Sequence, residues 1–213
     1  MQFYGLVFFR KALAGSKFIS KGKAEMDRRI LEAFEDCPVV AAIKDEEGLK
    51  KCLGSDIPIV FVLYGDICNI RDIVGRLKQA GKIVIIHLDL ITGLSSKEIA
   101  VTYLRSVTHG DGIISTKPAV IRKAKEEGMF AIMRFFVIDS IAFESIQKQV
   151  EYVHPDMIEI LPGLMPKVIR KICSQSRIPV IAGGLITDKE DIMAALGAGA
   201  ISISTTNQKV WFM

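Results

Sequence analysis

Eight short apolar runs recur along the chain at intervals of roughly 23 residues, and this repeat restricts the possible folds more than any other feature. The interval is the length of one strand, one helix and two short loops. The runs are continuously apolar rather than alternating, which is typical of parallel strands covered on both faces. They begin near Pro38, Ile59, Ile83, Gly112, Phe130, Met157, Val180 and Ala200.

The segments between the runs carry apolar residues at helical spacing, as in Phe143, Ile146, Val150 and Val153. Eight strand–helix units without a large insertion predict an α/β fold, a compact (β/α)8 barrel of the TIM type with parallel strands. An open doubly wound sheet is the alternative, because spacing does not reveal the order of the strands. The 213 residues are enough for one such domain.

The first 24 residues fall outside the repeat. Residues 1–30 hold seven Lys and Arg against two acidic residues, whereas the rest of the chain is nearly neutral. We assign residues 1–24 to a basic N-terminal extension, with a basic arm, a disordered extension and a translation-start artefact as open alternatives. Residues 25–213 are assigned to a single barrel domain. Met26, Ile30 and Phe34 share one helical face, so we expect a helix that leads into the first strand.

Several classes of protein are disfavoured by composition. The longest apolar runs are strand-sized, far short of the roughly 20 residues that span a bilayer, so no membrane partner is expected. The first apolar patch precedes its basic residues, which is the wrong order for a secretory signal. The cysteines are far apart, which predicts reduced thiols in a cytoplasmic protein with no metal site and no cofactor. They are Cys37, Cys52, Cys68 and Cys173.

The last two predicted strands are each followed by residues that suit a phosphate group. Gly183 and Gly184 allow backbone N–H groups to approach a ligand closely. Thr205 and Thr206 come after the eighth strand, ahead of a short helical stretch whose N-terminus would favour an anion. Phosphate groups of (β/α)8 barrels commonly lie between these two loops. The plain alternative for the glycine pair is a tight turn.

Polar residues also stand at the ends of the earlier strands, where the chemistry of such barrels is found. Their opposite charges suit a small polyol phosphate, with cations on the phosphate and carboxylates on the hydroxyls. Plainer alternatives are a core histidine at position 87, a structural ion pair between positions 134 and 159, and a solvent-facing lysine at position 117. The residues are Lys44, His87, Asp89, Lys117, Arg134 and Glu159.

Two predicted outer helices carry clusters of basic residues. We take them as candidate nucleic-acid contacts, with a solvated helix face as the plainer interpretation; RNA in particular is implied only by the family resemblance that follows. The net charge of +4 does not indicate a nucleic-acid partner, and no DNA partner is expected. The candidates are Arg122, Lys123 and Lys125 on one helix, and Lys167, Arg170 and Lys171 on the other.

Six segments, in one order along the chain, resemble the glycerol-3-phosphate-responsive antiterminators, which are bacterial regulators of glycerol uptake operons. The resemblance runs from about Asp27 to Phe212 and implies a TIM-type barrel. It also implies an effector, glycerol 3-phosphate, whose binding lets the protein act on leader mRNA so that transcription passes a terminator. The segments are IIHLDLITGL, DGIISTKPAVIRKAK, AIMRFFVIDS, MIEILPGLMPKVI, IPVIAGGLI and STTNQKVW.

The resemblance, carried over by position, implies a ligand site on residues already singled out, with Ser204 added. Lys117 stands where we would expect arginine, a change that keeps the charge and loses the planar fork. Residues 1–24 have no recognisable counterpart. The implied phosphate-binding residues are Gly183, Gly184, Ser204, Thr205 and Thr206. The implied glycerol-binding residues are His87, Asp89, Lys117, Arg134 and Glu159.

Two other functions stay open beside the ligand-gated RNA regulator, which is a binding protein and not an enzyme. A sugar-phosphate isomerase, epimerase or aldolase would use His87, Asp89 and Glu159 as acid and base, with Lys44 or Lys117 as a Schiff-base lysine. Barrels of this kind usually catalyse, so the residues alone would put this function first. The third function is a phosphate sensor that acts through a protein partner. The oligomeric state is left open.

Overall fold

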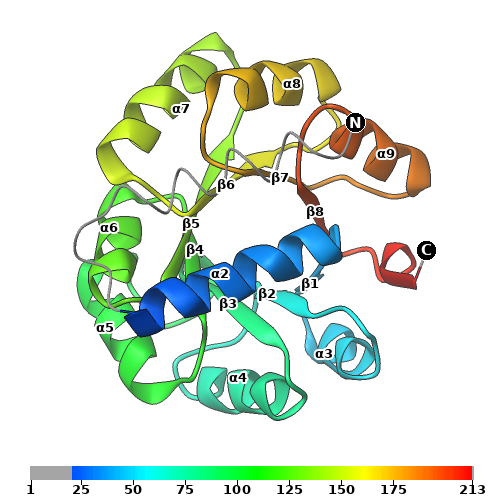
Figure 1. Ribbon diagram of the computed structural model, residues 1–213. Helices are drawn as coiled ribbons and strands as arrows, with labels where there is room; N and C mark the ends of the chain where they lie inside the picture. Colours follow the sequence, from blue (N-terminus) through cyan, green and yellow to red (C-terminus); the bar gives the residue numbers. More distant parts are fainter. Residues whose placement is uncertain (1–20, 213) are drawn as a thin grey trace.

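The eight predicted strands close into a barrel. In the computed structural model, which describes residues 21–212, parallel strands pair in the order β1 to β8, and β8 also pairs with β1 (Figure 1). This closure confirms the TIM-type fold and excludes the open doubly wound sheet. The strands are β1 (Val39–Ile43), β2 (Ile59–Val62), β3 (Ile83–His87), β4 (Gly112–Ser115), β5 (Phe130–Phe136), β6 (Met157–Leu161), β7 (Val180–Gly183) and β8 (Ser202–Thr205).

Helices on the outer wall follow the strands, and local sequence signals set where they begin. Asp45, Asp139 and Asp188 each cap a helix by accepting a hydrogen bond from a backbone N–H in its first turn. Pro118 and Pro166 open two others, at a position that needs no N–H donor. The elements are α3 (Glu46–Leu53), α4 (Ile70–Gln79), η2 (Leu88–Leu90), α5 (Glu98–Val107), α6 (Pro118–Glu126), α7 (Ser140–Val153), α8 (Pro166–Gln175), α9 (Lys189–Gly197) and η3 (Val210–Phe212).

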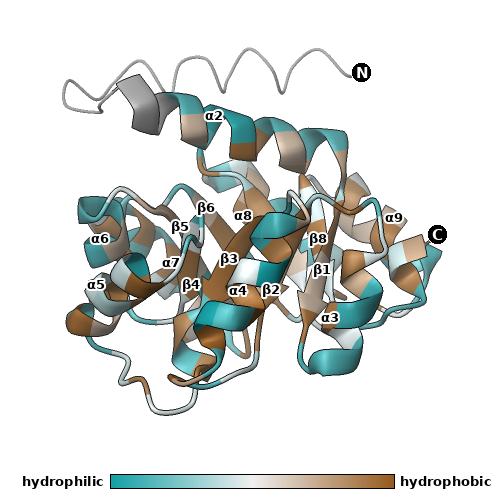
Figure 2. Cartoon of the chain, turned by 90° about the horizontal axis from the view of Figure 1, so that it is seen from below, coloured by the Kyte–Doolittle hydropathy of each residue, from teal (hydrophilic) through white to brown (hydrophobic). Residues whose placement is uncertain are grey.

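Helix α2 (Lys21–Asp36) lies across the end of the barrel where the strands begin (Figure 2). Ile30 and Phe34 on its inner face are fully buried against the barrel interior. The ring of Phe34 lies 6.5 Å from that of Phe61 and 6.4 Å from that of Phe130, centroid to centroid. The expected helix ahead of the first strand is therefore confirmed, and it closes the amino end of the barrel.

The first turn of α2 falls inside the segment assigned to the basic extension, because the helix begins at Lys21. Residues 1–20 of that extension lie outside the described residues. Within residues 21–212 no helix has both the length and the apolar character needed to cross a membrane. The four cysteines are free thiols.

The filling of the barrel changes from apolar to polar along its axis. Side chains near the amino end and the middle belong to one buried apolar cluster that also includes the inner face of α2. Inward-facing side chains at the carboxyl end, which we call the mouth, are polar. The apolar members on the strands include Val40, Phe61, Ile85, Ile114, Ile132 and Ile181.

Candidate functional site

Four polar side chains from four strands form a buried layer just inside the mouth. Side chains alternate across a strand, so Arg134 faces inward with Ile132 and Phe130, two and four residues earlier. His87 on β3, Glu159 on β6 and Ser204 on β8 are buried with it. We call His87, Arg134, Glu159 and Ser204 the polar layer. The structure thus brings together four of the ten predicted ligand-binding residues inside the barrel.

Glu159 is the centre of the polar layer. One carboxylate oxygen accepts a hydrogen bond from Nε of Arg134, and the other accepts one from the hydroxyl of Ser204. The ion pair considered as a structural alternative is therefore present. The guanidinium group of Arg134 makes no second hydrogen bond to any described residue. The N–H groups on its two terminal nitrogens therefore remain for another partner.

Gly183 on β7 makes room for this arrangement. A Cβ atom at this position would lie 2.6 Å from Oε1 of Glu159 and 2.7 Å from Oγ of Ser204. Any larger residue would push apart the two groups that bond to each other. The first glycine of the pair therefore has a steric role that a tight turn alone does not explain.

His87 contributes an unpaired nitrogen to the layer. The side chain is only 3% exposed, and its Nδ1 has no hydrogen-bond partner among the described residues. Burial, together with the charge of Arg134, lowers the pKa of His87 to about 3. The imidazole is therefore neutral at neutral pH, and it can exchange a hydrogen bond with a ligand hydroxyl.

Asp89 does not join the layer but anchors the corner between β4 and α6. Its carboxylate accepts hydrogen bonds from the hydroxyl of Ser115 at 2.7 Å, and from the backbone N–H and hydroxyl of Thr116 at 2.8 and 3.1 Å. Burial raises the pKa of Asp89, but the bonds from Thr116 and Ser115 outweigh it and hold the pKa below its ordinary value. Both carboxylate oxygens are thus engaged within the protein.

Lys117 follows directly after this corner and stays exposed ahead of α6. Its backbone N–H donates to the hydroxyl of Ser115 at 3.0 Å. Within the described part of the chain, its ammonium group pairs with no carboxylate, and the same holds for Lys44 after β1. Two cations without an acidic partner therefore stand at the mouth.

The backbone of the loop after β7 has a conformation that lets a ligand approach its N–H groups closely. Gly184 has a φ of 76° and Leu185 a φ of 63°, both left-handed. The carbonyl of Gly184 accepts from the N–H of Gly163, in the loop after β6, at 3.2 Å. Outside the sheet ladders, no hydrogen bond among the described residues uses the backbone N–H of Gly184, Leu185 or Thr206. These donors stand in the two loops where a phosphate was predicted.

The loop after β8 differs from the expectation. Thr205 donates its hydroxyl to the carbonyl of Ile186 at 2.9 Å and accepts from the N–H of Asn207 at 3.0 Å, so this hydroxyl ties the two loops together. The expected final helix is only a 3₁₀ turn, Val210–Phe212, too short to favour an anion through a dipole. Thr206 is exposed beside it.

The basic residues on α6 have partners within the protein. Arg122 donates to the hydroxyl of Tyr152 at 2.7 Å, Lys123 lies 2.9 Å from a carboxylate oxygen of Glu127, and Lys125 pairs with Asp156. On α8 the ammonium of Lys171 lies 4.5 Å from the ring centroid of Phe143. Lys167 and Arg170 are exposed, with no ion pair among the described residues. The α8 cluster is therefore the more open of the two.

Two residues that build the mouth were not among the predicted site residues. Ser115 bonds to Asp89, and Gly163 packs so closely that a Cβ there would lie 3.2 Å from the backbone of Gly183. Each stands in a polar or glycine-containing segment at the carboxyl end of a strand, which is the signal that would identify it. Residues 21–212 contain no cluster of three or more side chains able to hold a metal ion.

Comparison with known proteins gives a consistent picture. Residues 39–211 match the model of the family described as glycerol-3-phosphate responsive antiterminators. An uncharacterized protein of Escherichia coli K12, YgcP, is 47% identical over 182 residues, which are 85% of this chain and 95% of that protein.

Two solved structures carry related names. A glycerol uptake operon antiterminator regulatory protein of Listeria monocytogenes has a TM-score of 0.79 and 35% identity, over 82% of this chain and 94% of that one. A glycerol uptake operon antiterminator-related protein of Thermotoga maritima has a TM-score of 0.74 and 34% identity, over 83% and 99%. The chain therefore belongs to the glycerol-3-phosphate responsive antiterminator family.

Proposed function

We propose that this protein binds glycerol 3-phosphate in the mouth of the barrel and, in that state, acts on leader mRNA of glycerol-utilisation genes so that transcription passes a terminator. Family membership supports the effector and the regulatory role. The observation that carries the location is the polar layer, because the barrel interior toward the amino end is filled mainly by apolar side chains.

The glycerol end of the ligand lies against the polar layer. The terminal N–H groups of Arg134 donate to hydroxyl oxygens, and the neutral imidazole of His87 forms a hydrogen bond through Nδ1. Glu159 keeps Arg134 in place and is itself held by Ser204. A buried donor or acceptor without a partner costs roughly 1–3 kcal/mol, so a ligand that satisfies these groups gains both affinity and selectivity.

The phosphate end lies against the loops after β7 and β8. The backbone N–H groups of Gly184, Leu185 and Thr206 are the donors. Lys44 supplies positive charge from the neighbouring end of β1, and Lys117 from across the mouth, after β4. Backbone donors of this kind bind anions without a flexible side chain that would first have to be ordered. The arrangement distinguishes glycerol 3-phosphate from glycerol, which leaves these donors unused.

The regulatory step depends on glycerol 3-phosphate having a higher affinity for one arrangement of the mouth loops than for the others. A ligand that bridges the polar layer and the phosphate loops favours one arrangement of those loops, and RNA affinity changes only if the RNA distinguishes that arrangement from others. RNA affinity should therefore differ between the free protein and the protein saturated with glycerol 3-phosphate. Equal affinities in both states would contradict the gating.

The first experiment is a thermal-shift titration of the full chain. Glycerol 3-phosphate should stabilise the protein by about 2.7 kcal/mol at 100 times its dissociation constant, whereas glycerol and inorganic phosphate should do much less at the same concentration. A triose phosphate serves as the close analogue. No shift with glycerol 3-phosphate, or a stronger shift with the triose phosphate, would contradict the proposed effector.

A second experiment tests the location of the phosphate. Thr206→Glu places a carboxylate beside the phosphate donors on an exposed residue, so it should weaken ligand binding at least tenfold while the protein stays folded. Ser106→Glu is the matched control, since it adds the same charge on an exposed residue at the end of α5, away from the mouth. Equal affinities in the two variants would move the phosphate elsewhere.

An enzyme remains the second candidate, because His87 and Glu159 share a buried layer inside a barrel. Two features stand against it: Glu159 is held in an ion pair with Arg134, and Lys44 and Lys117 are exposed, whereas Schiff-base lysines are usually desolvated. Turnover of a triose or pentose phosphate that disappears in Glu159→Gln would support the enzyme. Catalysis is not needed for any contact described above.

A further inference from the structure

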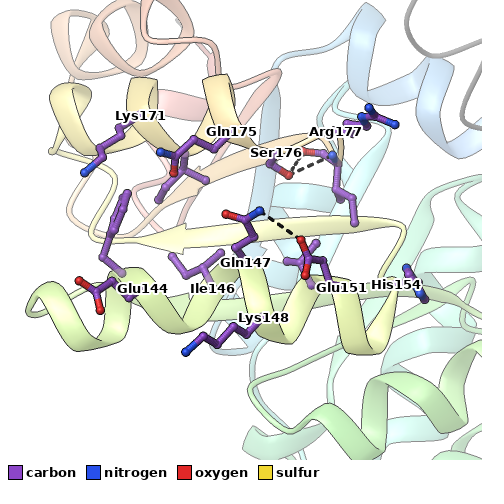
Figure 3. A pocket seen from close by; sticks show the side chains of 14 residues that line it. Glu144, Ile146, Gln147, Lys148, Glu151, His154, Lys171, Gln175, Ser176 and Arg177 are labelled. Carbon is purple, nitrogen blue, oxygen red and sulfur yellow. Dashed lines mark hydrogen bonds between the residues drawn. The ribbon is translucent and has the colours of Figure 1, made fainter.

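A groove runs along the outer wall of the barrel between α7 and α8 (Figure 3). Its volume is about 1020 Å³. It follows α7 from Phe143 to His154, a length of roughly 16 Å at the helical rise per residue. Its size lies at the upper limit of small-molecule sites, and its length along a helix suits a protein surface better than a metabolite.

The floor of the groove is apolar and its two walls differ in charge. Phe143, Ile146, Val150, Ile172 and Ile178 form the floor. Apolar side chains continue beyond the groove at the start of α7, where Ile138 is 82% exposed and Ile141 is 77% exposed. Large exposed apolar side chains gathered in one region are typical of an interaction surface.

The α7 wall carries Glu144 and Glu151, with Lys148 between them, whereas Lys171 and Arg177 stand on the α8 side (Figure 3). Among the described residues, no ion pair crosses the groove. The ammonium of Lys171 does lie over the ring of Phe143 across the groove, but it has no carboxylate partner there. The acidic groups on one wall and the basic groups on the other can therefore still form ion pairs with a partner that presents the opposite pattern.

We propose that this groove is the interface between two copies of the chain, related by a twofold axis that places α7 of one copy against α8 of the other. A twofold interface uses the same surface on both copies, so the acidic wall of each meets the basic wall of its partner twice. The apolar floors and the exposed isoleucines are covered at the same time.

The charge pattern favours a second copy over RNA. Phosphate groups along an RNA strand would be repelled by Glu144 and Glu151, which line the same groove as Lys171 and Arg177. Exposed isoleucines offer no flat ring for base stacking. A copy of this chain, in contrast, carries both the apolar floor and the complementary charges, so no other partner chemistry has to be invoked.

The test uses the full chain and measures its mass in solution by sedimentation across micromolar concentrations. The wild type should form a dimer. Lys171→Glu with Arg177→Glu places acidic walls against acidic walls, and Glu144→Lys with Glu151→Lys places basic walls against basic walls. Each double variant should therefore weaken self-association by on the order of 100-fold. Lys50→Glu with Arg71→Glu, exposed on α3 and α4, is the matched control and should remain dimeric.

The decisive part of the experiment is a mixture of the two double variants. The heterodimer pairs an acidic α7 wall with a basic α8 wall at one contact, and a basic α7 wall with an acidic α8 wall at the other, so the mixture should recover a dimer. An effect within one chain, such as loss of the Lys171–Phe143 contact, cannot be repaired by mixing. A monomeric wild type, dimeric double variants or a mixture that stays monomeric would each overturn the proposal. If the variant Lys171→Glu with Arg177→Glu has the same mass in solution as the wild type but binds RNA more weakly, the groove is an RNA site and the proposal is wrong.

Discussion

The two ends of the barrel are built from the same strands but differ in their side chains, which are mainly apolar at the amino end and polar at the carboxyl end. At the amino end, α2 covers the interior, and Phe34 packs against Phe61 and Phe130. At the carboxyl end, Glu159 bonds to Arg134 and Ser204 in a layer that none of the helices within residues 21–212 lies across. Apolar contacts are not directional, whereas a buried charge needs particular partners. The amino end is therefore suited to stabilising the fold, and the carboxyl end to the ligand recognition proposed above.

Breaking the amino end should have the largest effect on stability and little effect on ligand binding. Phe130→Ala removes a fully buried ring that contacts α2, so the free energy of unfolding should fall by about 3–5 kcal/mol. Urea unfolding measures the loss, and calorimetry of glycerol 3-phosphate binding should show an affinity within about threefold of the wild type. A large loss of affinity in the folded variant would mean that the two ends are coupled.

Breaking the ion pair at the carboxyl end should give the next largest effect. Arg134→Met leaves Glu159 buried without its cation and should cost about 3 kcal/mol of stability. The double variant Arg134→Met with Glu159→Leu should recover most of that stability, because no unpaired charge remains. Neither variant should bind glycerol 3-phosphate. A double variant that still binds would show that the polar layer is structural only.

Acid should act on the carboxyl end through His87. The folded pKa of about 3 lies below the ordinary value of 6.5, so between these values the unfolded chain binds a proton that the folded chain does not. The free energy of unfolding should therefore decrease as the pH falls, by up to about 1.4 kcal/mol per unit and about 2 kcal/mol in total at pH 5. His87→Gln should remove this share of the slope in urea unfolding between pH 7 and pH 5. An unchanged slope would contradict the buried, neutral imidazole.

The smallest effect should come from the corner that Asp89 anchors. Asp89→Asn weakens the bonds to Ser115 and Thr116 and should cost about 1 kcal/mol of stability. It should also weaken ligand binding a few fold, because Lys117 is then less well placed. Lys117→Arg in the same background should recover part of the affinity if the charge matters, and calorimetry measures both. An unchanged affinity for glycerol 3-phosphate would mean that the corner between β4 and α6 is not part of the ligand site.

The strand repeat predicted the barrel well, for a physical reason. Each strand is buried on both faces, so its apolar run is unbroken and easy to locate, as in the run that begins at Ile83. Period-two spacing also brings Arg134 and Glu159 to the inside of the barrel, and the resemblance pointed to the same positions. The glycerol and phosphate contacts themselves stay predictions.

The sequence did not reveal which polar groups form hydrogen bonds with one another inside the protein. Asp89 has the same residue type and strand-end position whether it binds a ligand or anchors Thr116, and only the three-dimensional contacts distinguish the two. The same holds for Thr205, whose hydroxyl connects two loops. The path of α2 was equally hidden, because an apolar helical face does not specify which end of the barrel it covers.

The position of α2 has a practical consequence for attaching the protein to a surface. A tether attached at the start of α2 leaves from the end opposite the mouth, so it leaves the loops after β7 and β8 open to solution. A tether at the carboxyl terminus joins beside Trp211, whose indole N–H donates to the carbonyl of Thr205 at 2.9 Å. Sensors built on this barrel should therefore be immobilised through α2.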